Sequence, residues 1–123
     1  MTIKFDMSHE LKVTNFSLRS KIFGTKWIEW ENESLTQKIF VYGTKLIIKL
    51  TCIETDIDWD NSDVKYLMEK QESGNPISLI ISDEPALPTI SSVGFYVTDV
   101  QFSYSTDKAG HNIRTFTVTL EEV

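Results

Sequence analysis

The sequence has little of what most chemical sites require: one cysteine, two histidines and five glycines in 123 residues. A single cysteine cannot form an internal disulfide, so the fold should not depend on one. His9 and His111 lie in separate polar segments without the local ligand pairs of a zinc site, and we expect both at the surface. The glycines form no phosphate-binding loop, and no G-x-S-x-G nucleophile motif occurs. The sequence therefore predicts neither an enzyme nor a cofactor.

Positive charge and long apolar runs are also scarce. Twelve Lys and Arg residues face eighteen Asp and Glu residues, giving a net charge of −6. No run of Lys and Arg stands out, and an acidic surface repels phosphate backbones, which argues against nucleic-acid binding. The longest near-apolar stretch, residues 46–53, contains Lys49 and is too short to cross a bilayer. The first residues form no apolar signal segment, so we expect synthesis in the cytoplasm and no membrane insertion.

What the sequence does contain is β-strand patterning. The length suits a single domain over residues 1–123. Residues 45–53 give the strongest strand, because Leu46, Ile48, Leu50 and Cys52 would share one face. Burial on that face makes Cys52 a core residue rather than a nucleophile. Further strands are expected at residues 26–31, 39–42 and 77–81, with a polar stretch at 32–37, a turn at Gly43 and a loop at 83–88.

One helix is expected, over residues 60–73. Asp60 would be its N-cap, with Trp59 and Val64 as a hydrophobic staple, and Gly74 would end it in a left-handed conformation.

The C-terminal third predicts a long β-hairpin. Residues 93–104 and 113–120 are β-type runs joined by the turn-rich segment 105–110. The apolar phase changes after Val97, and again near Thr14 in the first strand, which indicates bulges. The expected fold is mainly β (α+β): a twisted antiparallel sheet, or a sandwich or barrel, with one packed helix and a C-terminal hairpin.

The acidic run at residues 54–63 is the one candidate metal site. Asp58, Asp60 and Glu69 fall where a calcium loop places ligands. However, Asp63 replaces the glycine that the loop's turn needs, and Lys65 replaces an apolar residue. The sequence therefore favours a solvated strand end with no metal, with a calcium-dependent module as the weakest alternative.

Two features suggest contacts with partners. Trp27 and Trp30 differ in strand parity, so in a regular strand one can enter the core while the other lies exposed or in an interface; a bulge would bury both. Residues 115–120 are Thr-rich and nearly uncharged, and at a sheet edge they would be poorly protected against strand addition. Thr117 and Thr119, which point away from the apolar face, are therefore candidate interface residues.

The second half of the chain also carries a family pattern. Leu67 is followed by GNPISL at 74–79, GFYVTDVQF at 94–102, Gly110, and RTFTVTLEE at 114–122. This order resembles the small tail proteins of tailed bacteriophages, which include tail-terminator and baseplate-adaptor subunits. In that class a helix leads through a G-x-P turn into a short strand, and the chain ends on an F-x-V-x-L-x-E strand.

The resemblance implies a structural subunit of a virion tail or baseplate, without catalytic residues. Such a subunit acts through contacts with copies of itself, in a ring or stacked oligomer, and with other tail or baseplate proteins. It would be made in the cytoplasm and end in the virion. The alternative is a β-sandwich module that binds a carbohydrate or another ligand through Trp27 or Trp30.

Overall fold

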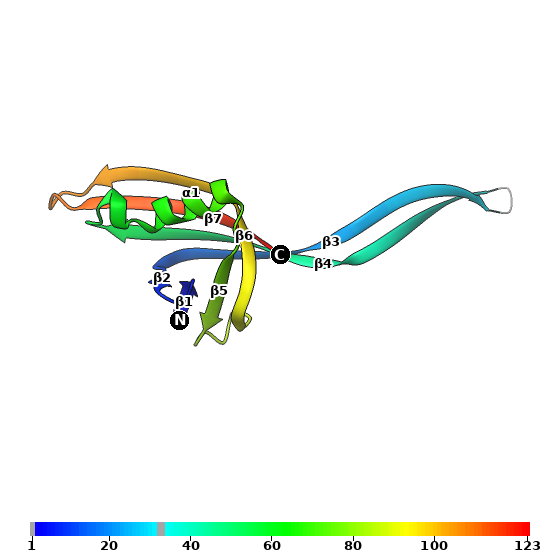
Figure 1. Cartoon of the computed structure of the whole chain (residues 1–123), viewed down its shortest axis with the longest axis horizontal. Coiled ribbons are helices and arrows are strands. Elements are labelled where there is room, and N and C mark those ends of the chain that lie inside the picture. Colours follow the sequence, from blue (N-terminus) through cyan, green and yellow to red (C-terminus); the bar gives the residue numbers. More distant parts are fainter. Residues whose placement is uncertain (1, 32–33) are drawn as a thin grey trace.

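The computed structural model describes the backbone of residues 2–31 and 34–123, and the side chains of residues 2–22 and 43–123. The described chain forms one seven-stranded antiparallel sheet in the order β2-β1-β5-β6-β7-β4-β3, with one α-helix (Figure 1). The strands are β1 (Thr2–Phe5), β2 (His9–Glu10), β3 (Val13–Glu31), β4 (Ser34–Thr55), β5 (Ile77–Ser82), β6 (Ile90–Thr106) and β7 (Asn112–Glu122). The predicted mainly β antiparallel fold is confirmed, and the sheet is not closed into a barrel.

Strand β6 joins the two parts of the sheet. Its first part pairs with β5, from Ile81↔Ile90 to Ile77↔Phe95, and its second part pairs with β7 up to Thr106↔Asn112. A register shift between Val97 and Asp99 confirms the predicted change of phase. Because β6 belongs to both parts, the strands β5, β1 and β2 turn away from the plane of β7, β4 and β3 (Figure 1).

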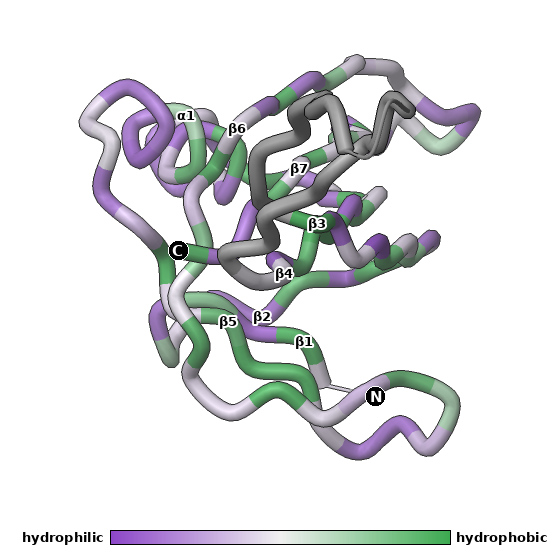
Figure 2. The backbone as a smooth tube through the Cα atoms, turned by 90° about the vertical axis from the view of Figure 1, so that its right-hand side faces the viewer, coloured by the Kyte–Doolittle hydropathy of each residue, from purple (hydrophilic) through white to green (hydrophobic). Residues whose placement is uncertain are grey.

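The core lies between these two parts of the sheet and the helix. Buried residues of β4 (Ile48, Leu50 and Cys52) and of β7 pack with buried residues of β1, β5 and β6 in one cluster. The predicted apolar face of residues 46–52 is thus confirmed, with Leu46 only partly buried. In Figure 2 the hydrophobic colour is concentrated on β1 and β5, whereas α1 carries both hydrophilic and hydrophobic residues.

The helix begins later than the sequence suggested. Residues Trp59–Asn61 form a short 3-10 helix, η1, and α1 spans Asp63–Ser73. Ser62, not Asp60, is the N-cap, because its Oγ accepts the hydrogen bond from the Val64 N–H at 3.1 Å. Gly74 ends the helix at φ 73°, as predicted. At 11 residues, α1 is too short to span a membrane, and no other described helix is longer.

Strands β3 and β4 are longer than expected. The predicted strand at residues 26–31 is part of β3, and the predicted turn at Gly43 is wrong, because β4 runs through it. A register shift in the β3–β4 pairing between Phe23 and Gly24 accommodates the irregularity near Gly43. The register shift between Val13 and Asn15 confirms the bulge predicted near Thr14.

The outer part of this hairpin leaves the sheet. Pairing of β4 with β7 ends at Ile47↔Glu121, whereas pairing of β3 with β4 continues from Ser20↔Leu46 to Glu31↔Ser34. We call residues 20–31 and 34–46 the outer ribbon. Among the described strands, none pairs with the ribbon except its own two members. At about 3.3 Å per residue it extends roughly 35 Å, and Figure 1 shows it projecting far from the remaining structure.

Candidate functional site

A polar cluster fixes the start of α1 to the sheet. Glu54, at the end of β4, is only 4% exposed. Its Oε1 accepts a hydrogen bond from the Asp63 N–H at 2.7 Å, and its Oε2 accepts one from the Ser62 hydroxyl at 2.8 Å. Arg114 on β7 donates to Glu54 Oε2 at 2.7 Å and to Ser62 Oγ at 3.1 Å. The cluster therefore links β4, α1 and β7 through a charge pair that is largely shielded from water.

This cluster is a structural anchor by its chemistry. A buried carboxylate needs charge-assisted hydrogen bonds to offset its lost hydration, and Glu54 has three. No buried side-chain nitrogen or oxygen in the described part of the chain lacks a hydrogen-bond partner. The polar groups of Glu54, Ser62 and Arg114 are thus hydrogen-bonded to one another.

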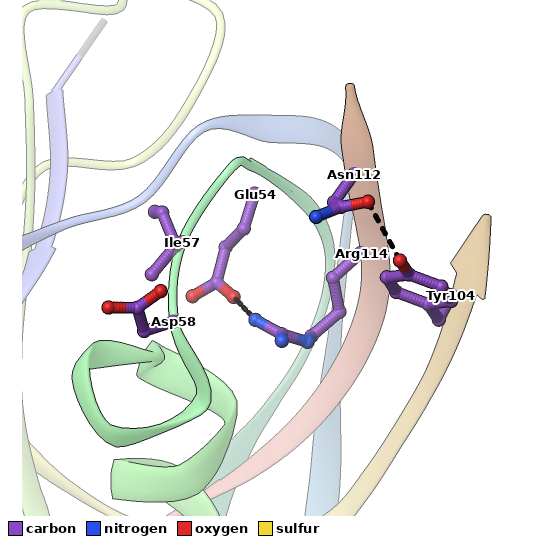
Figure 3. Close-up of a pocket in the computed structure, with 6 residues that line it drawn as sticks. All are labelled: Glu54, Ile57, Asp58, Tyr104, Asn112 and Arg114. Atoms are coloured by element: carbon purple, nitrogen blue, oxygen red, sulfur yellow. Dashed lines mark hydrogen bonds and ion pairs between the residues drawn. The ribbon is translucent and has the colours of Figure 1, made fainter. Parts of the chain in front are cut away.

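A small open pocket of about 160 Å³ adjoins the anchor. Figure 3 shows the Glu54–Arg114 pair on one side and Tyr104, whose hydroxyl donates to Asn112 Oδ1 at 2.7 Å, on the other. Ile57 and Asp58 complete the lining. The pocket is too small for a drug-sized ligand, which typically requires about 300 Å³ or more.

The surface around this pocket is both apolar and acidic. Ile57 and Trp59 are each 41% exposed, Phe102 is 45% exposed and Tyr104 is 60% exposed. The Trp59 and Phe102 rings lie 5.4 Å apart, and the Arg114 guanidinium lies over the Trp59 ring at 5.4 Å. Exposed aspartates alternate with the apolar residues just before α1. We call this surface the acidic end; it consists of Asp56, Ile57, Asp58, Trp59, Asp60, Phe102 and Tyr104.

Two aspartates of the acidic run are paired with neighbouring side chains. Asp60 pairs with Lys65 at 3.1 Å, and Asp56 accepts from the His111 ring and the Asn112 N–H at 2.7 and 2.9 Å. Within residues 2–22 and 43–123, no three His, Cys, Asp or Glu side chains are grouped to hold a metal ion. Asp60 and Glu69 line one shallow pocket while Asp58 lines another.

The two histidines differ from each other. His111 is exposed, as predicted. His9 is only partly exposed, which corrects the prediction: its Nδ1 lies 2.8 Å from Asp63 Oδ1 and its ring stacks on Phe5 at 4.6 Å. The sequence could not indicate this, because Asp63 is 54 positions away.

The Cys52 thiol and the Tyr66 hydroxyl have raised pKa values because of burial or hydrogen bonding within the fold. Burial raises the pKa of the Cys52 thiol to about 12, so it stays a protonated core residue as predicted. The Tyr66 hydroxyl donates to the Asp6 carboxylate, which raises the pKa of Tyr66 to about 12.

The outward face of the sheet, opposite the core, carries Thr117 and Thr119. Both are half-buried, and Thr117 Oγ1 lies 3.4 Å from Thr51 Oγ1. The premise that their strand lies at an edge is wrong, because β7 is paired with β6 on one side and β4 on the other. Strand addition at β7 is therefore excluded, although the side chains still belong to an accessible face.

The same face brings together a basic group that the linear sequence did not reveal. Register pairs Lys21 with Lys45, Arg19 with Ile47 and Ser17 with Lys49, and opposite residues share a face. Arg19, Lys21 and Lys49 are exposed, and Lys45 is half-buried. We call Arg19, Lys21, Lys45 and Lys49 the basic patch. Spacing along each strand hid it, since the cluster forms only when β3 and β4 pair.

The side chains of the other candidate interface residues, Trp27 and Trp30, lie outside the described residues. Their backbone belongs to the outer ribbon, where Trp27 pairs with Lys38 and Trp30 with Leu35.

Comparison with known proteins shows similarity in fold. The sequence matches no protein-family model and no curated protein. A chain from the tail of an empty GTA particle, solved by helical refinement with C6 symmetry, matches 100% of this chain and 90% of its own length, with a TM-score of 0.52 and 11% identity. A chain from the virion of a native gene transfer agent (GTA) particle matches with a TM-score of 0.47 and 17% identity, over 99% and 89% of the two chains. The protein therefore shares its overall fold with a chain from a GTA tail.

Proposed function

We propose that this protein is a structural subunit of a phage-type virion tail or baseplate, which assembles through contacts between copies of itself and with other tail proteins. In this role the chain performs no chemistry. It supplies the sheet and the outer ribbon, and neighbouring subunits cover the outer ribbon in the assembled particle.

The outer ribbon is the observation that carries this proposal. An isolated two-stranded hairpin is at best marginally stable in water, and needs a third strand, a helix or a partner surface. Among the described elements, none pairs with the ribbon outside its own two strands. Its sequence is also rich in large apolar residues, including Trp27, Trp30 and Phe40. A ribbon of this length and composition is best explained by burial against a neighbouring subunit.

The shared fold supports the same assignment. The matched GTA chain with a TM-score of 0.52 comes from the tail of a particle solved with C6 symmetry. Because the match covers the whole of this chain, the ribbon and the sheet are part of the aligned region rather than an addition to it. Identity of 11% supports no finer choice among tail tube, terminator and baseplate subunits.

Removal of the ribbon tests the proposal. Residues 22–44 would be replaced by Asn-Gly, because Lys21 and Lys45 are directly paired and a two-residue turn can connect them. The mass in solution would be measured by analytical ultracentrifugation and the particles viewed by electron microscopy. We expect the wild type to form rings or tubes at high concentration, and the shortened chain to remain a folded monomer with an unchanged core.

Two results would overturn the proposal. The first is a shortened chain that assembles as well as the wild type. The second is a wild type that stays monomeric at high concentration, alone and with other tail proteins, but binds a glycan in a way that Trp27→Ala or Trp30→Ala abolishes. The second result would favour the ligand-binding module instead.

A further inference from the structure

Charge is strongly segregated along this chain. Between residues 12 and 49 the basic residues outnumber the acidic ones, and from residue 50 onward the acidic residues dominate. The first segment holds Lys12, Arg19, Lys21, Lys26, Lys38, Lys45 and Lys49 against Glu29, Glu31 and Glu33. The second segment contains thirteen Asp and Glu residues and four Lys and Arg residues. Positive and negative charge are therefore unequally distributed between the two parts of the sequence.

The basic patch concentrates the positive charge where the ribbon leaves the sheet. Its members share the outward face of β3 and β4, so several like charges lie within a few strand positions of one another. The charges of Arg19, Lys21 and Lys49 repel one another at this spacing, and Glu121 of β7, which is opposite Ile47 on the same face, offsets them only in part. A negatively charged partner relieves the remaining repulsion.

The acidic end has complementary properties. Residues 55–61 are exposed throughout, and Asp56, Asp58 and Asp60 alternate with Ile57 and Trp59. The exposed rings of Phe102 and Tyr104 extend the apolar area. An aromatic centre with a charged rim is typical of a surface that binds another protein.

The two surfaces cannot meet within one chain. In Figure 1 the ribbon leaves the rest of the structure near the middle of the long axis and runs to the right, while the start of α1 and the turn between β6 and β7 lie at the far left. A contact between two different surfaces on identical copies is heterologous. It builds a ring if the rotation closes and a filament if it does not.

We propose that the basic patch of one copy docks onto the acidic end of the next copy, and that this contact sets the head-to-tail direction of assembly. The inference rests on the proposed function and identifies the partner of the basic patch as a second copy of this chain. A nucleic acid is the other polyanion that could occupy the patch, but the net charge of −6 opposes its approach.

Reciprocal charge reversal tests this contact. One variant carries Arg19→Glu, Lys21→Glu and Lys49→Glu, and a second carries Asp58→Lys and Asp60→Lys. Each variant alone brings like charges together at every contact, and we expect its apparent dissociation constant to rise by about tenfold or more. An equimolar mixture restores opposite charges at each contact, so assembly should return in the mixture. High salt should weaken wild-type assembly.

A matched control separates this contact from a general effect of net charge. The variant Lys4→Glu, Lys70→Glu lowers the net charge by four, against six for the patch variant, at positions outside both surfaces, and should assemble normally. Circular dichroism confirms that each variant is folded.

Three outcomes would overturn the inference while leaving the proposed function intact: assembly of both reversed variants, failure of their mixture to assemble, or equal loss in the control. Wild-type binding to DNA that is lost in the patch variant, with assembly unaffected, would assign the patch to phosphate instead. A wild type that never self-associates would overturn the proposed function itself.

Discussion

At the scale of single residues, β4 and β7 each present one almost fully buried apolar face to the core. Leu50 on β4 and Leu120 on β7 are both almost fully buried, and each packs within the one core cluster. Their alternation with polar neighbours was readable from the sequence, because a strand with one buried face requires a period of two.

We predict that Leu50→Ala and Leu120→Ala each lower the free energy of unfolding by about 2–5 kcal/mol, through lost apolar burial and the cavity left behind. Urea denaturation of a non-assembling variant, such as the ribbon deletion, would measure this. Leu18→Ala serves as the comparison, since Leu18 lies on β3 and is already 40% exposed. A midpoint unchanged for either buried leucine would contradict the assigned core.

The Asp63 carboxyl should make stability depend on pH. Burial raises the pKa of Asp63 above its ordinary value of 3.8, although the hydrogen bond from His9 partly opposes the shift. A raised pKa means that the folded state holds the proton more tightly than the unfolded state does. The stability from this group is therefore full below pH 3.8 and is lost as pH rises through the folded-state pKa.

We predict that wild type becomes less stable relative to Asp63→Asn as pH rises from about 3 to 6. Asp56 supplies a contrast, because the hydrogen bonds from the Asn112 N–H and His111 lower its pKa. Relative to Asp56→Asn, wild type should instead lose stability as pH falls below 3.8. Chemical unfolding across this range measures both, and two slopes of the same sign would refute the assignment.

At the scale of elements, the sequence located the helix but misplaced its start. Asp60, Ser62 and Asp63 are all acceptable caps by residue type. Ser62 is the N-cap because its hydroxyl is held by hydrogen bonds with Glu54 and Arg114, and Arg114 is 52 positions away in the sequence. A local pattern could not contain that information, whereas the end of the helix at Gly74 depends on a local backbone preference and was predicted correctly.

We predict that Ser62→Ala lowers the free energy of unfolding by about 1–2 kcal/mol, because it removes the cap and one partner of the buried Glu54. Asp60→Ala should change it by less than about 0.5 kcal/mol, since the exposed pair with Lys65 contributes little. Thermal or urea unfolding of the two variants side by side decides between the two caps. Equal effects would mean that Asp60 still caps the helix.

Long-range strand pairing also explains why the sequence-based predictions for Gly43 and for the position of β7 were wrong. Gly43 predicts a turn when read alone, but β4 continues through it because β3 pairs with it on both sides of the register shift. The position of β7 inside the sheet depends on β4 returning beside it, which the order of strands along the chain does not reveal. Periodicity thus predicted which faces are buried, while the edges, the ribbon and the basic patch required the pairing itself.

At the scale of the whole molecule, the correction to β7 changes what its threonines can do. Thr117 and Thr119 cannot offer a free strand edge, because both neighbours of β7 are paired. They do lie on the outward face with the basic patch, and Thr119 is directly opposite Lys49. If the patch binds the acidic end of another copy, assembly should depend on the sign of a charge introduced at these two positions more than on the size of the new side chain.

We predict that Thr117→Glu with Thr119→Glu weakens assembly by about tenfold or more, because it places carboxylates beside those of the docked copy. Thr117→Lys with Thr119→Lys should leave assembly unchanged or strengthen it, although the side chains are of similar bulk. Sedimentation at matched concentration and salt compares the two pairs. Equal weakening by both would mean that the face is packed too closely to admit either side chain. No effect from either would remove Thr117 and Thr119 from the interface and leave the ribbon as the principal contact between copies.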